Sequence, residues 1–134
     1  MKSLVVFALL VSPSLCRAQK LPDAPHKFFD RQNIILFSTN AGLIAADAAT
    51  TDHIVNHLPN GQEWNPIARP FVENTSAGKA AIFWAGTYVG SLGLSYLFHH
   101  TGHHHLERFT QYLLLGCETY SVTSNVITDS VADR

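Results

Sequence analysis

Residues 80–98 read AAIFWAGTYVGSLGLSYLF, a stretch of 19 residues without a charged side chain. A helix that crosses the hydrocarbon core of a bilayer needs about 20 consecutive apolar residues, so the length fits a membrane span. An amphipathic helix of a soluble bundle keeps a charged face toward water, and this stretch has no such face. The sequence therefore favours a membrane-spanning helix here, with a small soluble bundle as the alternative.

Two further helices are expected, one on each side of this stretch. Residues 33–51 are mostly apolar and carry one charge, Asp47, whereas residues 104–128 are more polar, with Glu118 near the middle. We predict an all-α fold in which three helices, about 32–57, 77–100 and 104–128, form a small, transmembrane bundle. The three helices make up a membrane domain of residues 32–128, followed by a tail of residues 129–134.

The connections between these helices carry turn and cap signals. Pro66 and Pro70 deny a long helix to residues 62–78, which are expected to form a structured loop. Thr75 or Ser76 can cap the helix that follows. Gly102 is expected to end that helix and start a turn.

The composition of the 134 residues excludes several classes of protein. The net charge is −1, with 9 Lys+Arg against 10 Asp+Glu, which argues against nucleic acid as a partner. Charged residues make up 14% of the chain, below the roughly 25% of soluble domains. Hydrophobic residues make up 46%, so the chain is not disordered by composition.

The N-terminus has the pattern of a secretory signal peptide over residues 1–18. Lys2 precedes a short apolar run at residues 4–11, and Cys16-Arg17-Ala18 resembles a cleavage site. An uncleaved anchor is the main alternative, and a lipoprotein at Cys16 is disfavoured because Leu15 is bulky. Cleavage leaves Cys117 alone, so no internal disulfide is expected. Residues 19–31 are predicted to be an extended linker with an interfacial segment at its end.

Polar residues recur every seven positions in the first and third helices. They form two trios, each on one helix face, which we expect to form a polar seam inside the bundle: Asn33, Asn40 and Asp47, and Gln111, Glu118 and Asn125. Counted from the helix starts, Asn40 matches Glu118 in depth and Asp47 matches Asn125. The seam residues are interpreted as polar contacts that hold the helices together, with an ion or proton site at Asp47 and Glu118 as the alternative.

The middle helix carries a ridge of small residues. Gly86 and Gly90 have the small-x-x-x-small spacing that lets helices approach closely, and a homo-oligomer through this face is an expected partner besides the lipid bilayer. Lys79, at the foot of this helix, can pair with Asp47 or Glu63.

A motif follows the first helix. It consists of Asp47, the threonine pair Thr50 and Thr51, the segment Gly61-x-Glu63-x-Asn65-Pro66, and Lys79. We expect Glu63 and Asn65 to bond loop amides or helix ends, and a substrate site is the alternative. The motif resembles a family of small bacterial multi-pass membrane proteins of unknown function, over roughly residues 33–98. The resemblance implies a multi-pass membrane protein and no particular reaction.

Histidines are the last unusual feature, with eight in the chain. Five of them surround the turn between the second and third helices: His99, His100, His103, His104 and His105. These histidines suggest a transition metal as the cofactor, and a closed site needs three or four ligands. The other interpretation is a set of solvated polar residues at the ends of membrane helices. His53 and His57 share one helix face, and the expected topology puts them across the membrane from this cluster and from His26.

These observations predict a small integral membrane protein with a structural or accessory role. An ion- or proton-coupled transport module using the intramembrane acids and a histidine-rich metal-binding membrane protein are the alternatives. No catalytic motif is present, so an enzyme is not expected. The expected location is the inner cell membrane in multi-pass form, with an exported periplasmic protein as the alternative.

Overall fold

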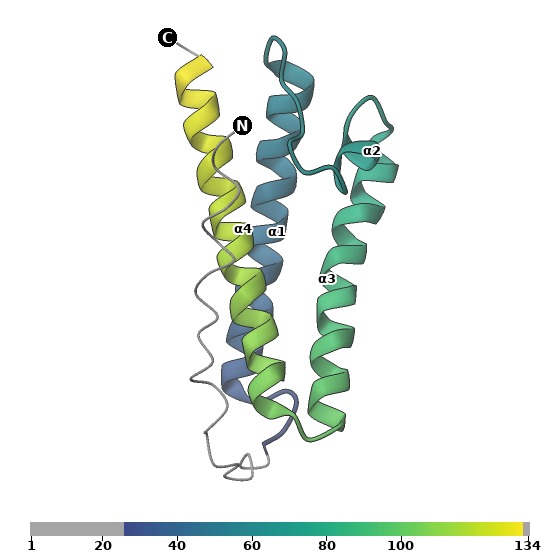
Figure 1. Ribbon diagram of the computed structural model, residues 1–134, viewed down its shortest axis with the longest axis vertical. Helices are drawn as coiled ribbons and strands as arrows, with labels where there is room; N and C mark the ends of the chain where they lie inside the picture. The colour runs from purple at the N-terminus through teal and green to yellow at the C-terminus, as the bar shows by residue number, and fades with distance from the viewer. Residues whose placement is uncertain (1–25, 133–134) are drawn as a thin grey trace, which may run out of the picture.

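The computed structural model describes residues 26–132, which form an all-helical bundle (Figure 1). Its elements are α1 (Arg31–His57), α2 (Arg69–Val72), α3 (Ala77–His100) and α4 (His104–Ala132). The predicted all-α bundle of three long helices is confirmed, and α2 is a further helix of four residues. The predicted signal peptide, residues 1–18, and the linker up to residue 25 lie outside the described residues.

Side-chain caps fix where two of the long helices begin. Asp30 is the N-cap of α1 and accepts a hydrogen bond of 2.7 Å from the backbone N–H of Asn33. Of the two expected caps of α3, Ser76 takes this position and accepts from the backbone N–H of Lys79. Such caps satisfy backbone donors that the first turn leaves without a partner.

The connections differ from the sequence expectations in three places. The expected loop 62–78 contains α2, which has Pro at its start, a position where the missing N–H of proline does no harm. The expected extended linker ends in a turn, and α1 begins at Arg31, one residue earlier than predicted. The prediction that the third helix ends at residue 128 is wrong, because α4 continues to Ala132. Residues 126–132 contain neither Gly nor Pro to end the helix.

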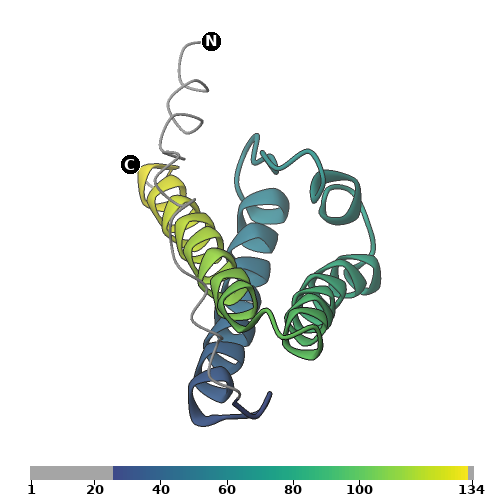
Figure 2. The same cartoon turned by 60° about the horizontal axis from the view of Figure 1, so that its bottom comes forward.

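The three long helices run up, down and up. Figures 1 and 2 show α1 and α4 crossing at an angle while they run in the same direction, with α3 running the opposite way. The most extensive helix interface is that of α1 with α4, followed by that of α3 with α4. Gly102, with φ of +75°, lies in the turn that reverses the chain between α3 and α4. This turn and the start of α1 lie at the same end of the bundle.

Burial in the bundle is the reverse of that in a water-soluble protein. Eight buried residues are polar or charged: Asn33, Asn40, Asp47, Thr51, Ser95, Glu107, Gln111 and Glu118. Only six buried residues are hydrophobic, among them Leu36, Phe37 and Ile44, whereas nineteen large hydrophobic residues are exposed. Ile82 and Val89 on α3, for example, are 74% and 65% exposed. The described part of the chain thus presents apolar side chains outward and packs polar ones inside.

Two of the described helices, α1 and α3, are long and apolar enough to cross a membrane. α3 has 24 residues and its buried residue is Ser95, so nearly all of its apolar surface faces outward. α1 has 27 residues and buries one face, which carries Asn33, Asn40 and Asp47. α4 is more polar and does not have the hydropathy of a membrane span by itself.

Candidate metal centre

Three segments of the chain meet at the end of the bundle that carries the α3–α4 turn. His26 comes from the segment before α1, His99 from the last turn of α3, and His104 and Glu107 from the first turn of α4. One ligand atom from each of these four residues lies within 4.8 Å of the others. We call this group the His₃Glu cluster.

Glu107 is the centre of the His₃Glu cluster and is completely buried. Its Oε2 atom lies 2.9 Å from Nδ1 of His99, 3.2 Å from Nδ1 of His104 and 3.4 Å from Nε2 of His26. The three imidazole rings surround this oxygen with centroid separations of 4.6 to 5.1 Å. A single carboxylate oxygen is therefore faced by three imidazole nitrogens.

The hydrogen-bond partners of His26 indicate which of its nitrogens carries the proton. Nδ1 faces two acceptors at 3.0 Å, the backbone carbonyl of Lys27 and Oδ2 of Asp30, so it is the donor. In the neutral ring this leaves Nε2 as an acceptor. Nε2 is buried without a hydrogen-bond partner among the described residues, and it points at another acceptor, Oε2 of Glu107. Two acceptors held 3.4 Å apart in a buried place are stabilised by either a proton or a metal ion between them.

Three of the six distances between the ligand atoms are close to those in a tetrahedral metal site. A tetrahedron with bonds of about 2.0–2.1 Å to nitrogen and oxygen has edges of about 3.3–3.4 Å. The three distances from Glu107 Oε2 run from 2.9 to 3.4 Å and thus lie close to such edges. His99 and His104 would bind through Nδ1, His26 through Nε2 and Glu107 through Oε2.

Outer residues hold two of the four ligands in place. The side-chain amide of Asn33 donates to Oε1 of Glu107, which leaves Oε2 for the histidines. Asp30 holds His26 through Nδ1, and Nη2 of Arg108 lies 2.7 Å from Oδ2 of Asp30. The N–H of Asn33, opposed by partial burial and aided by Arg108, holds the pKa of Asp30 below its usual value. Carboxylate–histidine pairs of this kind orient metal-binding imidazoles in proteins.

Aromatic packing positions the segment that carries His26. The ring of Phe28 lies 5.2 Å from that of Phe37, 5.4 Å from that of Tyr96 and 5.4 Å from the imidazole of His99. Asn33 also donates to the backbone carbonyl of Phe28 at 2.9 Å. The segment before α1 is thereby fixed against both α1 and α3.

Only two of the five histidines predicted as ligands belong to the cluster, namely His99 and His104. The ring of His100 stacks on Tyr96 at 6.0 Å, and Nδ1 of His103 lies 3.0 Å from Oγ1 of Thr101. His105 lies on α4 outside the cluster. The structure therefore does not bring these three into one group with His99 and His104, and metal binding by them stays a prediction.

Sequence reasoning missed Glu107 and did not include His26 among the ligands. The spacing of His104 and Glu107, three positions on a helix, places both side chains on one face and was a usable signal. His26 had a weaker signal, the expected topology that puts it on the same side as the turn. His53 and His57 stack on each other at 5.4 Å near the other end of α1, as their spacing predicts.

The six seam residues lie between the helices, with one change of pairing. Nδ2 of Asn40 donates to Oε1 of Gln111 at 2.7 Å, so the expected match of Asn40 with Glu118 is wrong. Gln111 is completely buried and donates in turn to Oγ of Ser95 on α3. The match of Asp47 with Asn125 holds, at 3.0 Å. Helix starts alone do not give depth, because α1 and α4 cross at an angle and the polar contacts fix their register.

The loop-motif residues form hydrogen bonds toward the end of the bundle that lies opposite the His₃Glu cluster. Asn125 Nδ2 donates to Oγ1 of Thr50 and of Thr51 at 3.0 and 3.1 Å. Oε1 of Glu63 accepts from the N–H of Asn65 at 2.6 Å, and Oδ1 of Asn65 accepts from the N–H of Ile67 at 3.0 Å. These are bonds to loop amides, as expected for Glu63 and Asn65, and they span Pro66.

Two other motif residues have different surroundings. Gly61 packs so closely on α1 that a Cβ atom would lie 1.8 Å from the carbonyl oxygen of Ile54. Lys79 places its ammonium 5.9 Å from the centre of the Phe71 ring, and within residues 26–132 it forms no ion pair with Asp47 or Glu63. The expected pairing of Lys79 is therefore wrong.

Gly86 and Gly90 lie on an open face of α3. A Cβ atom at either position would meet nothing within 4 Å among the described residues. The small-residue ridge thus makes no close helix contact within the chain, and its use in a homo-oligomer stays a prediction.

The chain matches no family model, no curated protein and no solved structure.

Proposed function

We propose that this protein is a small integral membrane protein that binds a transition metal ion, with zinc as the best fit, at the His₃Glu cluster. The observation that carries the proposal is the convergence of His26, His99 and His104 on one oxygen of the buried Glu107. A metal at this place would tie the segment before α1 to the α3–α4 turn.

The inverted burial pattern supports the membrane location. Polar residues form the interior, and apolar residues such as Ile82 and Val89 cover the outside of α3. We infer a multi-pass topology in which α1, α3 and α4 all cross the inner membrane. α4 is the most polar of the three, and its polar groups pair with α1 through Asn40–Gln111 and Asp47–Asn125. The resemblance of residues 33–98 to small bacterial membrane proteins agrees with this topology.

The ligand set supports a structural role for the metal. Four protein ligands would complete a tetrahedral site, whereas catalytic zinc sites keep a position open for water. Imidazole and carboxylate ligands suit zinc and neighbouring first-row metals. The protein accordingly serves as an accessory or structural component of the membrane whose fold depends on metal, and the bound ion supplies folding free energy rather than a reaction.

The decisive experiment measures metal content and site geometry together. Full-length protein purified in detergent is loaded with zinc, desalted and analysed by inductively coupled plasma mass spectrometry. We expect one equivalent per chain, lost in His99→Ala and in His104→Ala and kept in the matched controls His100→Ala and His103→Ala. Cobalt loaded in place of zinc should give the intense visible absorption of a tetrahedral ion.

Two results overturn the proposal. The first is wild-type protein that retains less than a tenth of an equivalent of zinc and cobalt after desalting. The second is equal metal loss in the His100→Ala and His103→Ala controls, which would assign binding to a diffuse histidine-rich surface instead of the His₃Glu cluster.

A further inference from the structure

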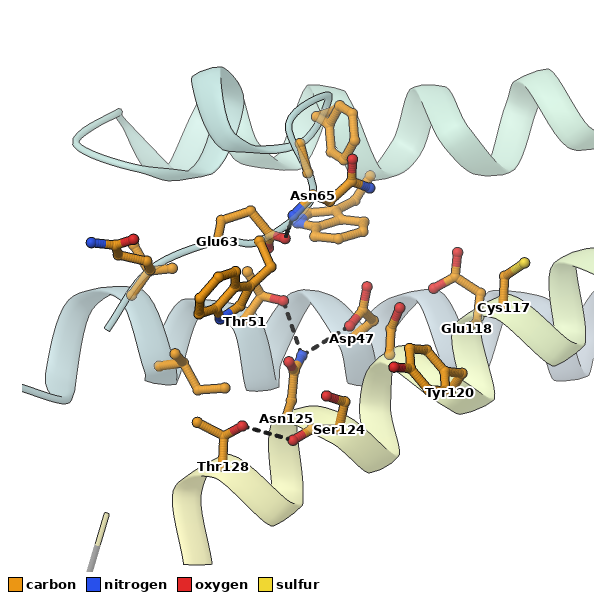
Figure 3. A pocket seen from close by; sticks show the side chains of 18 of the residues that line it. Asp47, Thr51, Glu63, Asn65, Cys117, Glu118, Tyr120, Ser124, Asn125 and Thr128 are labelled. Atoms are coloured by element: carbon orange, nitrogen blue, oxygen red, sulfur yellow. Dashed lines mark hydrogen bonds between the residues drawn. The ribbon is translucent and has the colours of Figure 1, made fainter. Parts of the chain in front are cut away.

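A second polar site lies at the opposite end of the bundle, where α3 stands apart from α1. A cavity of about 580 Å³ opens there between α1, α4, the start of α3 and the segment 62–68 (Figure 3). It shares no residue with the His₃Glu cluster. We call it the acidic cavity, because Asp47, Glu63 and Glu118 line it.

Among the described residues, the acidic cavity has no basic side chain opposite its acids. Lys and Arg are absent from its described lining, which holds three carboxyl groups. Asp47 and Glu118 are only 6% and 7% exposed. Figure 3 shows their carboxyl groups rising from α1 and α4 into the space below Glu63 and Asn65. Burying a carboxylate without a partner is costly, so the site is stabilised either by a proton on the carboxyl group or by a positively charged occupant.

Glu118 supplies the most specific indication of a ligand. Its Oε2 atom is buried and has no hydrogen-bond partner among residues 26–132. Asp47, by contrast, accepts from Asn125 through Oδ1 at 3.0 Å. Buried polar atoms in proteins nearly always have partners, so the acceptor on Glu118 calls for a donor from outside the chain.

The spacing of the carboxyl groups does not favour a bare metal ion as the occupant. Groups of His, Cys, Asp and Glu close enough to hold one ion occur in the described chain at the His₃Glu cluster, and the three carboxylates of the cavity form no such group. The volume is also many times that of one ion. The occupant is therefore a larger cation that reaches several groups at once.

Aromatic side chains give the cavity its second chemical property. Trp64, Trp84 and Tyr120 line it together with the acids. Aromatic faces attract organic cations, and indole does so most strongly. An ammonium group also donates hydrogen bonds, which suits the acceptor on Glu118.

We propose that the acidic cavity binds an organic primary ammonium ion, with the N–H groups donated to Glu118 and Asp47 and the carbon substituent against Trp64, Trp84 and Tyr120. Such a group belongs either to a free amine or to the headgroup of phosphatidylethanolamine. Both sources present the same chemistry to the cavity.

The chain contains its own reporter for this site. It has two tryptophans, Trp64 and Trp84, and both line the acidic cavity. Full-length protein in nanodiscs of phosphatidylglycerol is titrated with butylammonium chloride while the tryptophan emission is recorded. We expect a saturable change that potassium chloride at equal concentration does not produce.

Variants and lipids complete the experiment. Glu118→Gln should weaken butylammonium binding at least tenfold, whereas Asp52→Asn, an exposed acid on the same helix as Asp47 and outside the cavity, should leave it unchanged. Glu118→Gln should still retain one equivalent of zinc, so that failure of the metal proposal and failure of this one are distinguishable. Should free amine give no response, exchange of phosphatidylglycerol for phosphatidylethanolamine should shift the emission in wild type and not in Glu118→Gln, which assigns the lipid headgroup.

A measurement without substitutions guards against misfolded variants. Cys117 is exposed and lines the cavity, so bound amine should slow its alkylation by a maleimide in the wild-type protein. The proposal is overturned when neither butylammonium nor phosphatidylethanolamine alters emission or alkylation. An equal response to potassium chloride, or equal loss of binding in Asp52→Asn and Glu118→Gln, overturns it as well.

Discussion

Asn33 and Glu107 lie 74 positions apart in the chain, yet the side-chain amide of Asn33 donates to Oε1 of Glu107 inside the bundle. The other oxygen of the same carboxyl group faces His26, His99 and His104. The amide of Asn33 thus holds Oε1, and Oε2 is directed at the three histidines.

Replacing Asn33 should weaken metal binding without removing any ligand. In Asn33→Ala the carboxyl group of Glu107 loses its anchor, and we expect the affinity for zinc to fall by about 10- to 100-fold, as for other residues that orient metal ligands. Competition with a fluorescent chelator measures this affinity. Gln32→Ala removes a neighbouring amide that bonds the hydroxyl of Tyr112, and it is the control. Equal affinities of the two variants would contradict the role given to Asn33.

Removal of the metal should lower the thermal stability of the protein. A ligand that binds only the folded state at a hundred times its Kd raises the free energy of unfolding by about 2.7 kcal/mol. We expect a lower Tm after treatment with a chelator and its recovery on adding zinc, followed by circular dichroism in detergent. His104→Ala should show neither change. A Tm that is the same with and without zinc in the wild type would rule out a metal that stabilises the fold.

The contact of Gln111 with both neighbouring helices should stabilise the bundle. Gln111→Ala removes the side-chain partner of Asn40 and of Ser95, both of which are completely buried, and leaves Asn40 its bond to the backbone carbonyl of residue 111. Leaving such groups unsatisfied costs about 1–3 kcal/mol each, so a marked loss of stability is expected. Thr119→Ala on the exposed face of α4 should stay within about 0.5 kcal/mol of the wild type. Urea or thermal unfolding in detergent compares the two, and similar values would argue against a polar core.

Gly61 should tolerate no side chain, although it is a loop residue. A Cβ atom there would meet the carbonyl oxygen of Ile54, and Gly61→Ala must shift the loop or the last turn of α1. We expect destabilisation above about 1 kcal/mol. Gly42→Ala, where a Cβ meets nothing within 4 Å, should be neutral or stabilising by about 0.5–1 kcal/mol because alanine favours the helix. The difference between the two melting temperatures is the measurement, and its absence would show that the loop lies elsewhere.

The exposed apolar surface predicts how the protein fractionates. Because α3 presents Ile82, Val89 and Leu94 outward, the protein should stay in the membrane pellet after a wash with alkaline carbonate and enter solution only with detergent. A known peripheral membrane protein serves as the control and should be released. Recovery of the chain in the carbonate supernatant would favour the exported periplasmic alternative.

The long helices could be predicted from sequence because their signal is local. A charge-free run at residues 80–98 and a proline-free run before His57 decide where helices form, and the observed α3 matches residues 77–100. The extra helix α2 has only four residues and is too short to give a periodic pattern. The late end of α4 was missed because the acid and hydroxyl residues after Thr128 resemble a tail, although none of them breaks a helix.

The candidate sites bring together residues that are far apart in the sequence, and a single sequence predicts such contacts only in part. Seven-residue spacing correctly placed the seam residues between helices, but the register of α1 against α4 follows from contacts such as Asn40–Gln111. Closeness in sequence predicts His100, His103 and His105 as ligands together with His99 and His104. The structure instead places His26 and Glu107 in the cluster. His26 is far from the other ligands in the sequence, and Glu107 is not a histidine.

The parallel course of α1 and α4 has a consequence for biogenesis. In the proposed multi-pass topology, His26 is translated before the first helix and Glu107 after the third long helix has begun, so the two meet only when every helix has been inserted in its proper direction. A chain with one helix left out or reversed separates these ligands by the thickness of the bilayer. Zinc capture would then mark chains that have completed insertion, and the others would lack the bond that protects them from quality-control proteases.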